Sequence, residues 1–473
     1  MIRAGLAHWF SRSIGYPLII NGGWRRDKDR KGFNRLLREK FESQFWPAEQ
    51  IEGWQLERLQ RLLVHAGRAV PYYRDLFREV GFDPRDVRRA ADLGGLPPLT
   101  RQVIRAQGRR MLADGASAAG LIAGQTSGTT GVPLDFWRDR NYDRHLEAAA
   151  WMSDMAAGRN FGSPTAYLWG WTPLPSRYQR LLSRLRNVLR NQQHYNTRLM
   201  PDEALQQYHQ AMQSRPPDIL VAYPSGAALL ARYLERHGVR PRYPRLALIP
   251  SGEVLEPEMR ATIERVFPAP IFNRYGSREV GLMAFDCDRH TGLHVNTANL
   301  ILECTGPDVE AQPSDVIVTP LHSYAMPLIR YQVDDLAVMA SGDCACGRTS
   351  PRLLRVAGRK MPHFFTPAGT PVEPYFLISK VRQMANVVEF QLIQEDRRHL
   401  RLLVVPGPGC GPEQFTEARA AIQGLMGAEC ELRIDFVDTI PRPPSGKLAM
   451  LRPMMPADGS ISDSVDAQFV NGR

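Results

Sequence analysis

The sequence contains few cysteines and no long hydrophobic segment. Six cysteines in 473 residues are too few for a disulfide-rich secreted scaffold, so we expect reduced thiols and a cytoplasmic protein. No apolar run approaches the length that spans a bilayer, so we predict no integral membrane segment. Residues 1–20 interrupt short apolar patches with Arg3, His8 and Arg12, which is not typical of a cleaved secretion signal.

Acidic residues are fewer than basic ones. The 60 Lys and Arg residues exceed the 49 Asp and Glu residues and leave a net charge of +11, which suits an anionic ligand or surface without identifying it. The arginines are dispersed and no basic module with interleaved aromatics is present, so nucleic-acid binding is not expected. The length exceeds that of a single hydrophobic core and predicts two or more domains.

A lysine is missing where phosphate-binding loops usually carry one. Gln125–Pro133 reads Gln-Thr-Ser-Gly-Thr-Thr-Gly-Val-Pro, and backbone N–H groups and hydroxyls in such a turn can bind an anion. No Lys follows Gly128 or Gly131, which excludes the usual nucleotide loop. We interpret the stretch as a phosphate-binding loop, with a polar surface loop as the alternative.

Strands alternate with helices in the middle of the chain. This order predicts a mostly parallel α/β sheet whose ligands bind beyond the carboxyl ends of its strands. We interpret 271–279 as a further repeat of the same strand-and-turn pattern. The predicted strands are 165–170, 218–225 and 246–253, and the predicted helices are 143–157, 226–236 and 257–266.

The remaining segments predict an antiparallel region and a small second domain. Residues 293–340 alternate as antiparallel strands do, and the character of the chain changes at Gly358-Arg359. The predicted fold class is α/β, with a large N-terminal domain of mostly parallel sheets and a β region, and a small mobile α+β C-terminal domain. We place the domains at 1–357 and 358–453, followed by a disordered tail at 454–473.

Residues 177–190 predict a basic amphipathic helix, in which arginines separate leucines and a valine. Such a helix can contact cofactor phosphates or an acidic membrane surface. The alternative is a solvated helix face.

Four motifs follow one another along the chain: the Gln125–Pro133 loop, Tyr275-Gly276-Ser277-Arg278-Glu279, Arg330–Asp335 and Ser445-Gly446-Lys447. This ordered set resembles the adenylate-forming superfamily of acyl-CoA synthetases. The chain is most similar to the phenylacetate–CoA ligase branch, which includes capsule-biosynthesis-type relatives. The resemblance extends from about residue 55 to about residue 450.

The resemblance implies ATP-dependent activation of a carboxylic acid. The acid attacks the α-phosphate of ATP, which yields an acyl-adenylate and pyrophosphate, and coenzyme A then displaces AMP. This chemistry requires positioning and charge stabilisation more than a covalent nucleophile. The alternative is a non-catalytic or altered-acceptor nucleotide-binding relative that serves polysaccharide or natural-product biosynthesis.

The resemblance also assigns roles to single residues. Lys447 would stabilise charge between the acid and the α-phosphate, Glu279 would hold Mg²⁺, and Asp335 would accept hydrogen bonds from the ribose. The loop from Thr126 would grip the ATP phosphates. The implied catalytic and nucleotide-binding residues are Lys447, Glu279, Thr126, Ser127, Gly128, Thr129, Thr130, Gly131, Ser251, Gly252, Glu253, Arg274, Tyr275, Gly276, Ser277, Asp335 and Arg359.

Two positions depart from the family's pattern. Asp334 occupies a place that is usually glycine, and Pro362 stands where relatives carry an aspartate, three residues after Arg359 at the interdomain hinge. Proline fixes φ and offers no carboxylate. The departure leaves open a reaction that stops at the adenylate or uses another acceptor.

Two further sites are expected, one for the carboxylic acid and one for a structural metal. Trp169–Pro173, Tyr223 and Ser251 are expected to line the acid site, where aromatic rings suit an aryl or other apolar acid. Cys344 and Cys346, with Cys287 and either His290 or His294, form a candidate Cys₃His zinc site. Free buried thiols are the alternative. The expected cofactors are ATP/AMP, Mg²⁺ and coenzyme A, with structural Zn²⁺ if the cysteines and histidine bind a metal.

Overall fold

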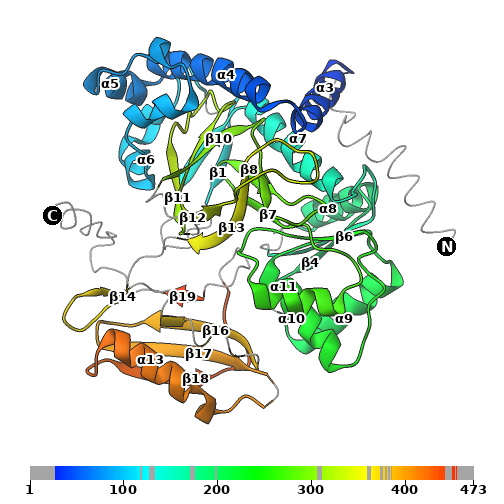
Figure 1. Cartoon of the computed structure of the whole chain (residues 1–473). Helices are drawn as coiled ribbons and strands as arrows, with labels where there is room; N and C mark the ends of the chain where they lie inside the picture. The colour runs from blue at the N-terminus through cyan, green and yellow to red at the C-terminus, as the bar shows by residue number, and fades with distance from the viewer. Residues whose placement is uncertain are drawn as a thin grey trace. The chain divides into compact units, whose positions relative to one another are not determined.

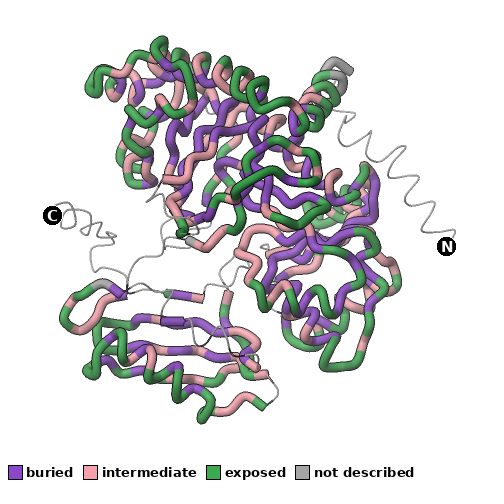
Figure 2. Tube along the Cα trace, in the orientation of Figure 1, coloured by how far each residue is buried: buried purple, intermediate pink, exposed green. Residues whose placement is uncertain are grey.

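The computed structural model describes residues 27–117, 120–126, 134–170, 176–197, 200–305, 312–359, 364–372, 377–378, 381, 384, 386–407, 409–442, 450–452 and 454. These residues form two compact units, the first ending at Arg359 (Figure 1). Buried residues concentrate on the strands of each unit (Figure 2). Ser127–Pro133, Pro362, Lys447 and the predicted tail from residue 455 onwards lie outside the described residues.

The first unit begins with helices that pack on its larger sheet. Proline suits the first turn of a helix because its φ is fixed, and Pro71 begins α5, while Pro47 occupies the cap position before α4. Thr100 caps the next helix by accepting a hydrogen bond from the Val103 N–H at 3.3 Å. The elements are α3 (Asp27–Ser43), α4 (Ala48–Ala69), α5 (Pro71–Glu79), α6 (Arg101–Gln107) and 3₁₀ turns at Pro84–Asp86, Ala90–Gly95 and Gly108–Met111.

The larger sheet has seven strands in the order β10-β11-β12-β13-β9-β8-β7, and its neighbours pair antiparallel. This confirms the predicted antiparallel region. Residues 271–279 contain the predicted strand and turn, but the strand does not extend the parallel sheet: a tight turn returns β7 directly to β8, and parallel pairing needs a long crossover. The strands are β7 (Arg274–Ser277), β8 (Gly281–Phe285), β9 (Leu293–Val295), β10 (Leu300–Thr305), β11 (Ser314–Pro320), β12 (Tyr331–Met339) and β13 (Arg352–Arg359).

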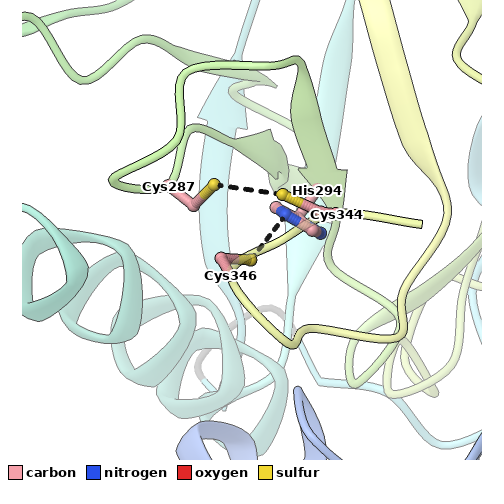
Figure 3. Close-up of side chains that lie close together, drawn as sticks. All are labelled: Cys287, His294, Cys344 and Cys346. Carbon is pink, nitrogen blue, oxygen red and sulfur yellow. Dashed lines mark hydrogen bonds between the residues drawn. The ribbon is translucent and has the colours of Figure 1, made fainter.

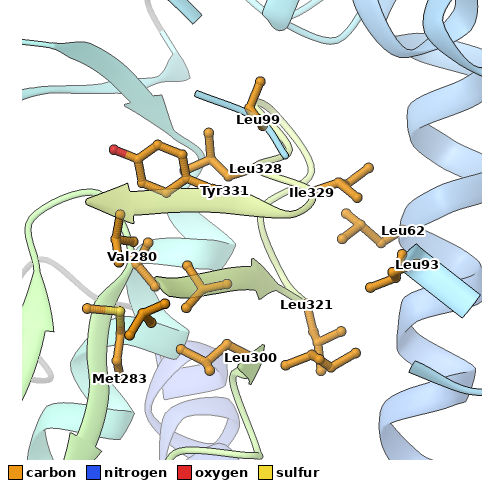
Figure 4. Close-up of a cluster of buried hydrophobic side chains, with 14 of the residues drawn as sticks. Leu62, Leu93, Leu99, Val280, Met283, Leu300, Leu321, Leu328, Ile329 and Tyr331 are labelled. Carbon is orange, nitrogen blue, oxygen red and sulfur yellow. The ribbon is translucent and has the colours of Figure 1, made fainter. Parts of the chain in front are cut away.

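The main core of the first unit lies between α4 and this sheet. Leu62 on α4 and Leu93 and Leu99 after it are buried with Leu300 and Tyr331 from the sheet (Figure 4). Each buried side chain of this kind contributes roughly 1.5–3 kcal/mol to the stability of the fold. The core therefore fixes the strands that carry the Tyr275–Glu279 and Arg330–Asp335 motifs.

A second sheet of four parallel strands, in the order β4-β3-β5-β6, confirms the predicted parallel α/β arrangement. Alternate residues of its strands face α9, α10 and α11, because side chains of a strand point to opposite faces in turn. The strands are β3 (Thr165–Trp169), β4 (Gln192–Asn196), β5 (Ile219–Ala222) and β6 (Ala247–Pro250). The helices are α7 (Arg140–Ala156), α8 (Arg177–Leu189), α9 (Asp202–Ser214), α10 (Pro224–Arg236) and α11 (Pro257–Val266). An antiparallel hairpin, β1 (Ile122–Gln125) with β2 (Asp135–Arg138), completes the unit.

The second unit is an α+β unit with its own core. Its sheet has the order β18-β17-β16-β19 and packs on α13 through Leu392, Leu402, Phe415 and Ile422. The elements are β14 (Phe364–Phe365), β15 (Pro371–Val372), β16 (Val387–Gln394), β17 (His399–Pro406), a 3₁₀ turn (Pro412–Phe415), α13 (Thr416–Met426), β18 (Glu431–Phe436) and β19 (Leu451–Arg452). In the part of the chain that the structure describes, no helix is long and apolar enough to cross a membrane.

Candidate functional site

Three predicted residues lie at the carboxyl edge of the parallel sheet. Ser251 follows β6, and its N–H donates to the Ala222 carbonyl at the end of β5 at 3.0 Å. Glu253 reaches across the same edge, where its Oε2 accepts from the Ser225 N–H at 3.0 Å. Gly252 lies between them. Ligands of parallel sheets bind at this edge.

An aromatic pair lies beside Gly252. The Trp169 ring at the end of β3 stacks on the Tyr223 ring after β5, with centroids 4.0 Å apart. Gly252 has a φ of +85°, and a Cβ there would come within 2.9 Å of the Tyr223 ring. Only glycine tolerates both the left-handed backbone and this close approach. The edge thus combines an apolar aromatic surface with the polar groups of Ser251 and Glu253.

Glu279 is a buried carboxylate, only 2% exposed, between β7 and β8. Its Oε1 accepts from the Tyr331 hydroxyl at 2.9 Å and lies 3.4 Å from the Arg101 Nη2. The Arg101 Nε forms a second ion pair, 2.8 Å long, with Asp334. Burial and the neighbouring carboxylate raise the pKa of Tyr331 well above its ordinary value, so its hydroxyl remains a donor. Arg101 therefore links Glu279 to the Arg330–Asp335 motif.

Asp335 is buried on β12, where its Oδ2 accepts from the Tyr275 hydroxyl at 2.7 Å. Its partner in the register of β13 is Arg359. The preceding Asp334 has a φ of +61°, a left-handed conformation that favours glycine and that aspartate tolerates better than most residues. The departure from the family's glycine is thus compatible with the backbone that presents Asp335.

The base of the predicted phosphate loop meets the same region. Thr126 forms two hydrogen bonds with Leu134, each 2.9 Å long. Its N–H donates to the Leu134 carbonyl, and its Oγ1 accepts from the Leu134 N–H. The Arg278 Nη1 donates to the Gln125 carbonyl at 2.8 Å. The Tyr275–Glu279 motif thereby contacts the hairpin that carries the loop.

Three other predicted residues shape the β7–β8 hairpin in this structure. Arg274 forms an ion pair with the buried Asp154, 2.7 Å long. A Cβ at Gly276 would lie 2.4 Å from the Gly281 carbonyl oxygen, so glycine is required there. The Ser277 Oγ accepts from the Val280 N–H at 3.2 Å. The side chain of Arg359 lies outside the described residues.

The sequence interpretation assigned no role to Arg101 or Tyr142. Arg101 follows the Thr100 cap in a short helix, where an arginine is usually solvated, and its partners are distant in the chain. The Tyr142 hydroxyl donates to the Val280 carbonyl at 3.2 Å and so supports the turn that carries Glu279. No local pattern marks either residue.

A second cluster joins three cysteines and a histidine (Figure 3). The ligand atoms of Cys287, His294, Cys344 and Cys346 all lie within 4.8 Å of one another. The Cys287 and Cys344 sulfurs are 3.7 Å apart, and the Cys346 Sγ is 3.3 Å from the His294 Nε2. A tetrahedral zinc ion, bound to sulfur at about 2.3 Å and to nitrogen at about 2.0 Å, separates its ligands by roughly 3.5–3.8 Å. The geometry fits zinc.

Neighbouring groups orient this cluster. The His294 Nδ1 lies 3.2 Å from the Ser350 Oγ, which turns Nε2 toward the thiols. The Arg289 N–H donates to the Cys287 Sγ at 3.4 Å. His290 pairs instead with Asp286, at 2.9 Å. Of the two histidines that the sequence left open, the structure places His294 in the cluster.

Comparison with known proteins identifies similar proteins named phenylacetate–coenzyme A ligase and CapK. Residues 364–452 match the family model described as the CapK C-terminal domain. The chain is 26% identical over 324 residues to a phenylacetate–coenzyme A ligase of Thermus thermophilus, a match that covers 66% of this chain and 71% of the relative. It is 22% identical over 399 residues to the protein CapK of Staphylococcus aureus, which covers 83% and 87% of the two chains.

Solved structures share the fold. A 2-hydroxyisobutyryl-CoA ligase, crystallised in the postadenylation state with R3-HIB-AMP, matches with a TM-score of 0.66 at 20% identity, covering 86% of this chain and 90% of that one. The same ligase in the thioesterification state, with 2-HIB-AMP and CoA, matches with a TM-score of 0.58 at 21% identity, covering 87% and 91%.

Proposed function

We propose that this chain, a member of the adenylate-forming superfamily in the phenylacetate–CoA ligase-like branch that includes CapK, activates a carboxylic acid with ATP and transfers the acyl group to coenzyme A. One observation carries the proposal. The Arg101–Glu279–Tyr331 contacts and the Tyr275–Asp335 hydrogen bond bring two separate motifs together, and Arg278 connects them to the base of the glycine loop.

In the first half-reaction, a carboxylate oxygen attacks the α-phosphorus of ATP and pyrophosphate leaves. Glu279 offers the hard oxygen ligand that Mg²⁺ prefers, and the ion would neutralise the phosphates. Tyr331 and Arg101 hold the Glu279 carboxylate in one orientation. Thr126 and the loop after it would bind the phosphates through hydroxyl and backbone donors, and Lys447 would stabilise the charge that develops at the α-phosphate.

The nucleoside would lie in the first unit, between Ser251–Glu253 at the carboxyl edge of the parallel sheet and the Tyr275–Asp335 pair on the larger sheet. Asp335 accepts hydrogen bonds only, as recognition of ribose hydroxyls requires. Tyr275 keeps its carboxylate oriented through the 2.7 Å hydrogen bond. Tyr275 thus acts as a positioning residue, while Ser251, Gly252 and Glu253 supply polar groups for the base.

The acid is proposed to be aryl or otherwise apolar. The stacked Trp169 and Tyr223 present aromatic surface at the edge where Ser251 ends β6. Aromatic surface binds apolar groups through buried area and ring stacking. The names of the phenylacetate–coenzyme A ligase relatives support the same class.

Zinc at Cys287, His294, Cys344 and Cys346 is proposed as a structural ion. Four protein ligands would leave no open position for a substrate, which is typical of structural rather than catalytic zinc. The ion would link the β8–β9 turn to the loop between β12 and β13.

The proposal is tested by ATP–pyrophosphate exchange with a panel of acids. We expect exchange with at least one arylacetic or benzoic acid, and weaker exchange with short polar acids. Absence of exchange with every acid, together with measurable ATP binding, would overturn acid activation and support a non-catalytic nucleotide-binding relative. The purified wild-type chain and its Glu279→Gln variant provide the matched pair.

A second candidate differs in the acceptor. Pro362, which stands where relatives carry an aspartate, favours an altered-acceptor relative that serves polysaccharide or natural-product biosynthesis. Release of AMP from the preformed adenylate distinguishes the two. Acceleration by coenzyme A supports the ligase, whereas acceleration by amines alone supports the altered acceptor.

A further inference from the structure

Helix α8 turns its apolar side to solvent. Tyr178, Leu181, Leu182, Leu185 and Val188 recur at helical spacing and so share one side of the helix. They are among the most exposed large apolar side chains of the described residues, from 46% for Leu182 to 70% for Tyr178. Amphipathic helices of globular proteins normally turn this side to the core. The orientation of α8 is therefore reversed.

The opposite side of α8 faces the protein. Ser183 and Asn187, which are polar, are half-buried. The helix precedes β4, the edge strand of the parallel sheet (Figure 1). Reversal leaves five apolar side chains without a contribution to the core, so folding of the unit does not explain their presence.

The charged residues of α8 itself have one sign. The sequence contains no Asp or Glu between Asp154 and Asp202, while five arginines lie within 177–190. At 100° per residue, Arg184 borders one edge of the apolar side of α8 and Arg186 borders the other. A partner that complements this arrangement is apolar inside and anionic at its surface.

We propose that α8 lies in the surface of a membrane that contains anionic lipids. The leucines and the valine would enter the boundary between headgroups and acyl chains, while the arginines bind lipid phosphates. Its 13 residues span about 20 Å, too short to cross the hydrocarbon core but suited to lie along it. A peripheral site of this kind is independent of the proposed acid activation.

The test is sedimentation of the full chain with vesicles. We expect strong binding to vesicles of phosphatidylcholine and phosphatidylglycerol in equal parts, weak binding to phosphatidylcholine alone, and loss of binding at high salt. Leu181→Ser/Leu185→Ser should lower the partition coefficient by about tenfold or more, because it removes apolar area from the bilayer. Arg184→Gln/Arg186→Gln should lower it by about tenfold on anionic vesicles only.

The matched control is Val64→Ser/Leu246→Ser, which removes two exposed apolar side chains from other parts of the first unit. This variant should bind vesicles as the wild type does. Hydrogen exchange of residues 176–190 should slow on anionic vesicles, while exchange in α4 should not change.

Three outcomes would overturn the proposal. They are absence of vesicle binding by the wild type, equal binding to both vesicle types, or binding that the α8 variants leave unchanged. The first is expected if an acidic protein or another segment of the chain covers this side of α8. Thermal unfolding of each variant verifies that the exposed substitutions leave the fold intact.

Discussion

At the scale of single residues, Glu279 depends on its neighbours. A buried carboxylate without partners destabilises a protein strongly, whereas donors and a cation offset the cost of removing it from water. Tyr331 and Arg101 supply both. The same contacts that make burial tolerable would also orient a carboxylate oxygen toward the proposed Mg²⁺, so structural and functional demands would coincide at this residue.

Removal of the Tyr331 hydroxyl tests this arrangement. Tyr331→Phe should lower the free energy of unfolding by about 1–3 kcal/mol, because a buried acceptor loses its donor. It should also slow ATP–pyrophosphate exchange by about tenfold, whereas Glu279→Gln should slow it by about a hundredfold or more. Chemical denaturation and initial exchange rates provide the two measurements.

Tyr72→Phe is the control, because it removes a half-buried hydroxyl elsewhere in the first unit. It should leave exchange unchanged. Exchange by Tyr331→Phe at the wild-type rate would contradict the positioning role.

At the scale of elements, the cysteine–histidine cluster joins segments that the sequence separates by more than 50 residues. Cys287 follows β8, His294 lies on β9, and Cys344 and Cys346 lie between β12 and β13. A metal that binds only the folded arrangement stabilises it by mass action. The β region should accordingly be the part most sensitive to metal removal.

Metal analysis of the purified protein should find about one zinc ion per chain, as four converging ligands predict. Cys344→Ser/Cys346→Ser should contain none, while Cys304→Ser/Cys410→Ser, which alters thiols outside the cluster, should retain zinc. A strong chelator should lower the Tm of the wild type but not that of the zinc-free variant. A stable, metal-free wild type would disprove the assignment.

At the scale of the whole molecule, we propose that the chemistry uses residues far apart in the chain. The first unit contains Glu279 and Asp335, and Lys447 lies near the C-terminal end of the sequence. We predict that Lys447→Ala abolishes exchange while ATP affinity changes less than about twofold, since a lysine that acts at the transition state contributes little to ground-state binding. Exchange assays and calorimetric ATP titration measure the two effects.

Lys380→Ala provides the comparison, because it removes the same charge from the same part of the sequence. It should exchange as the wild type does. A parallel loss of ATP binding in Lys447→Ala would assign the lysine to binding instead of catalysis.

The sequence by itself determined the order of motifs, the parallel α/β region, the antiparallel region and the thiols of the second cluster. The parallel and antiparallel regions follow from neighbouring residues, through strand and helix periods and turn residues. The same local signals identified the strand and turn in 271–279 but not its sheet, because a strand before a turn has the same pattern whether a helix or an antiparallel strand follows.

Only the tertiary structure decided which side chains meet. It brought Arg101 to Glu279 across 178 residues, chose His294 over His290, and turned the apolar side of α8 outward. These outcomes depend on contacts between distant segments, and no local period specifies which of two histidines or which side of a helix such contacts will select.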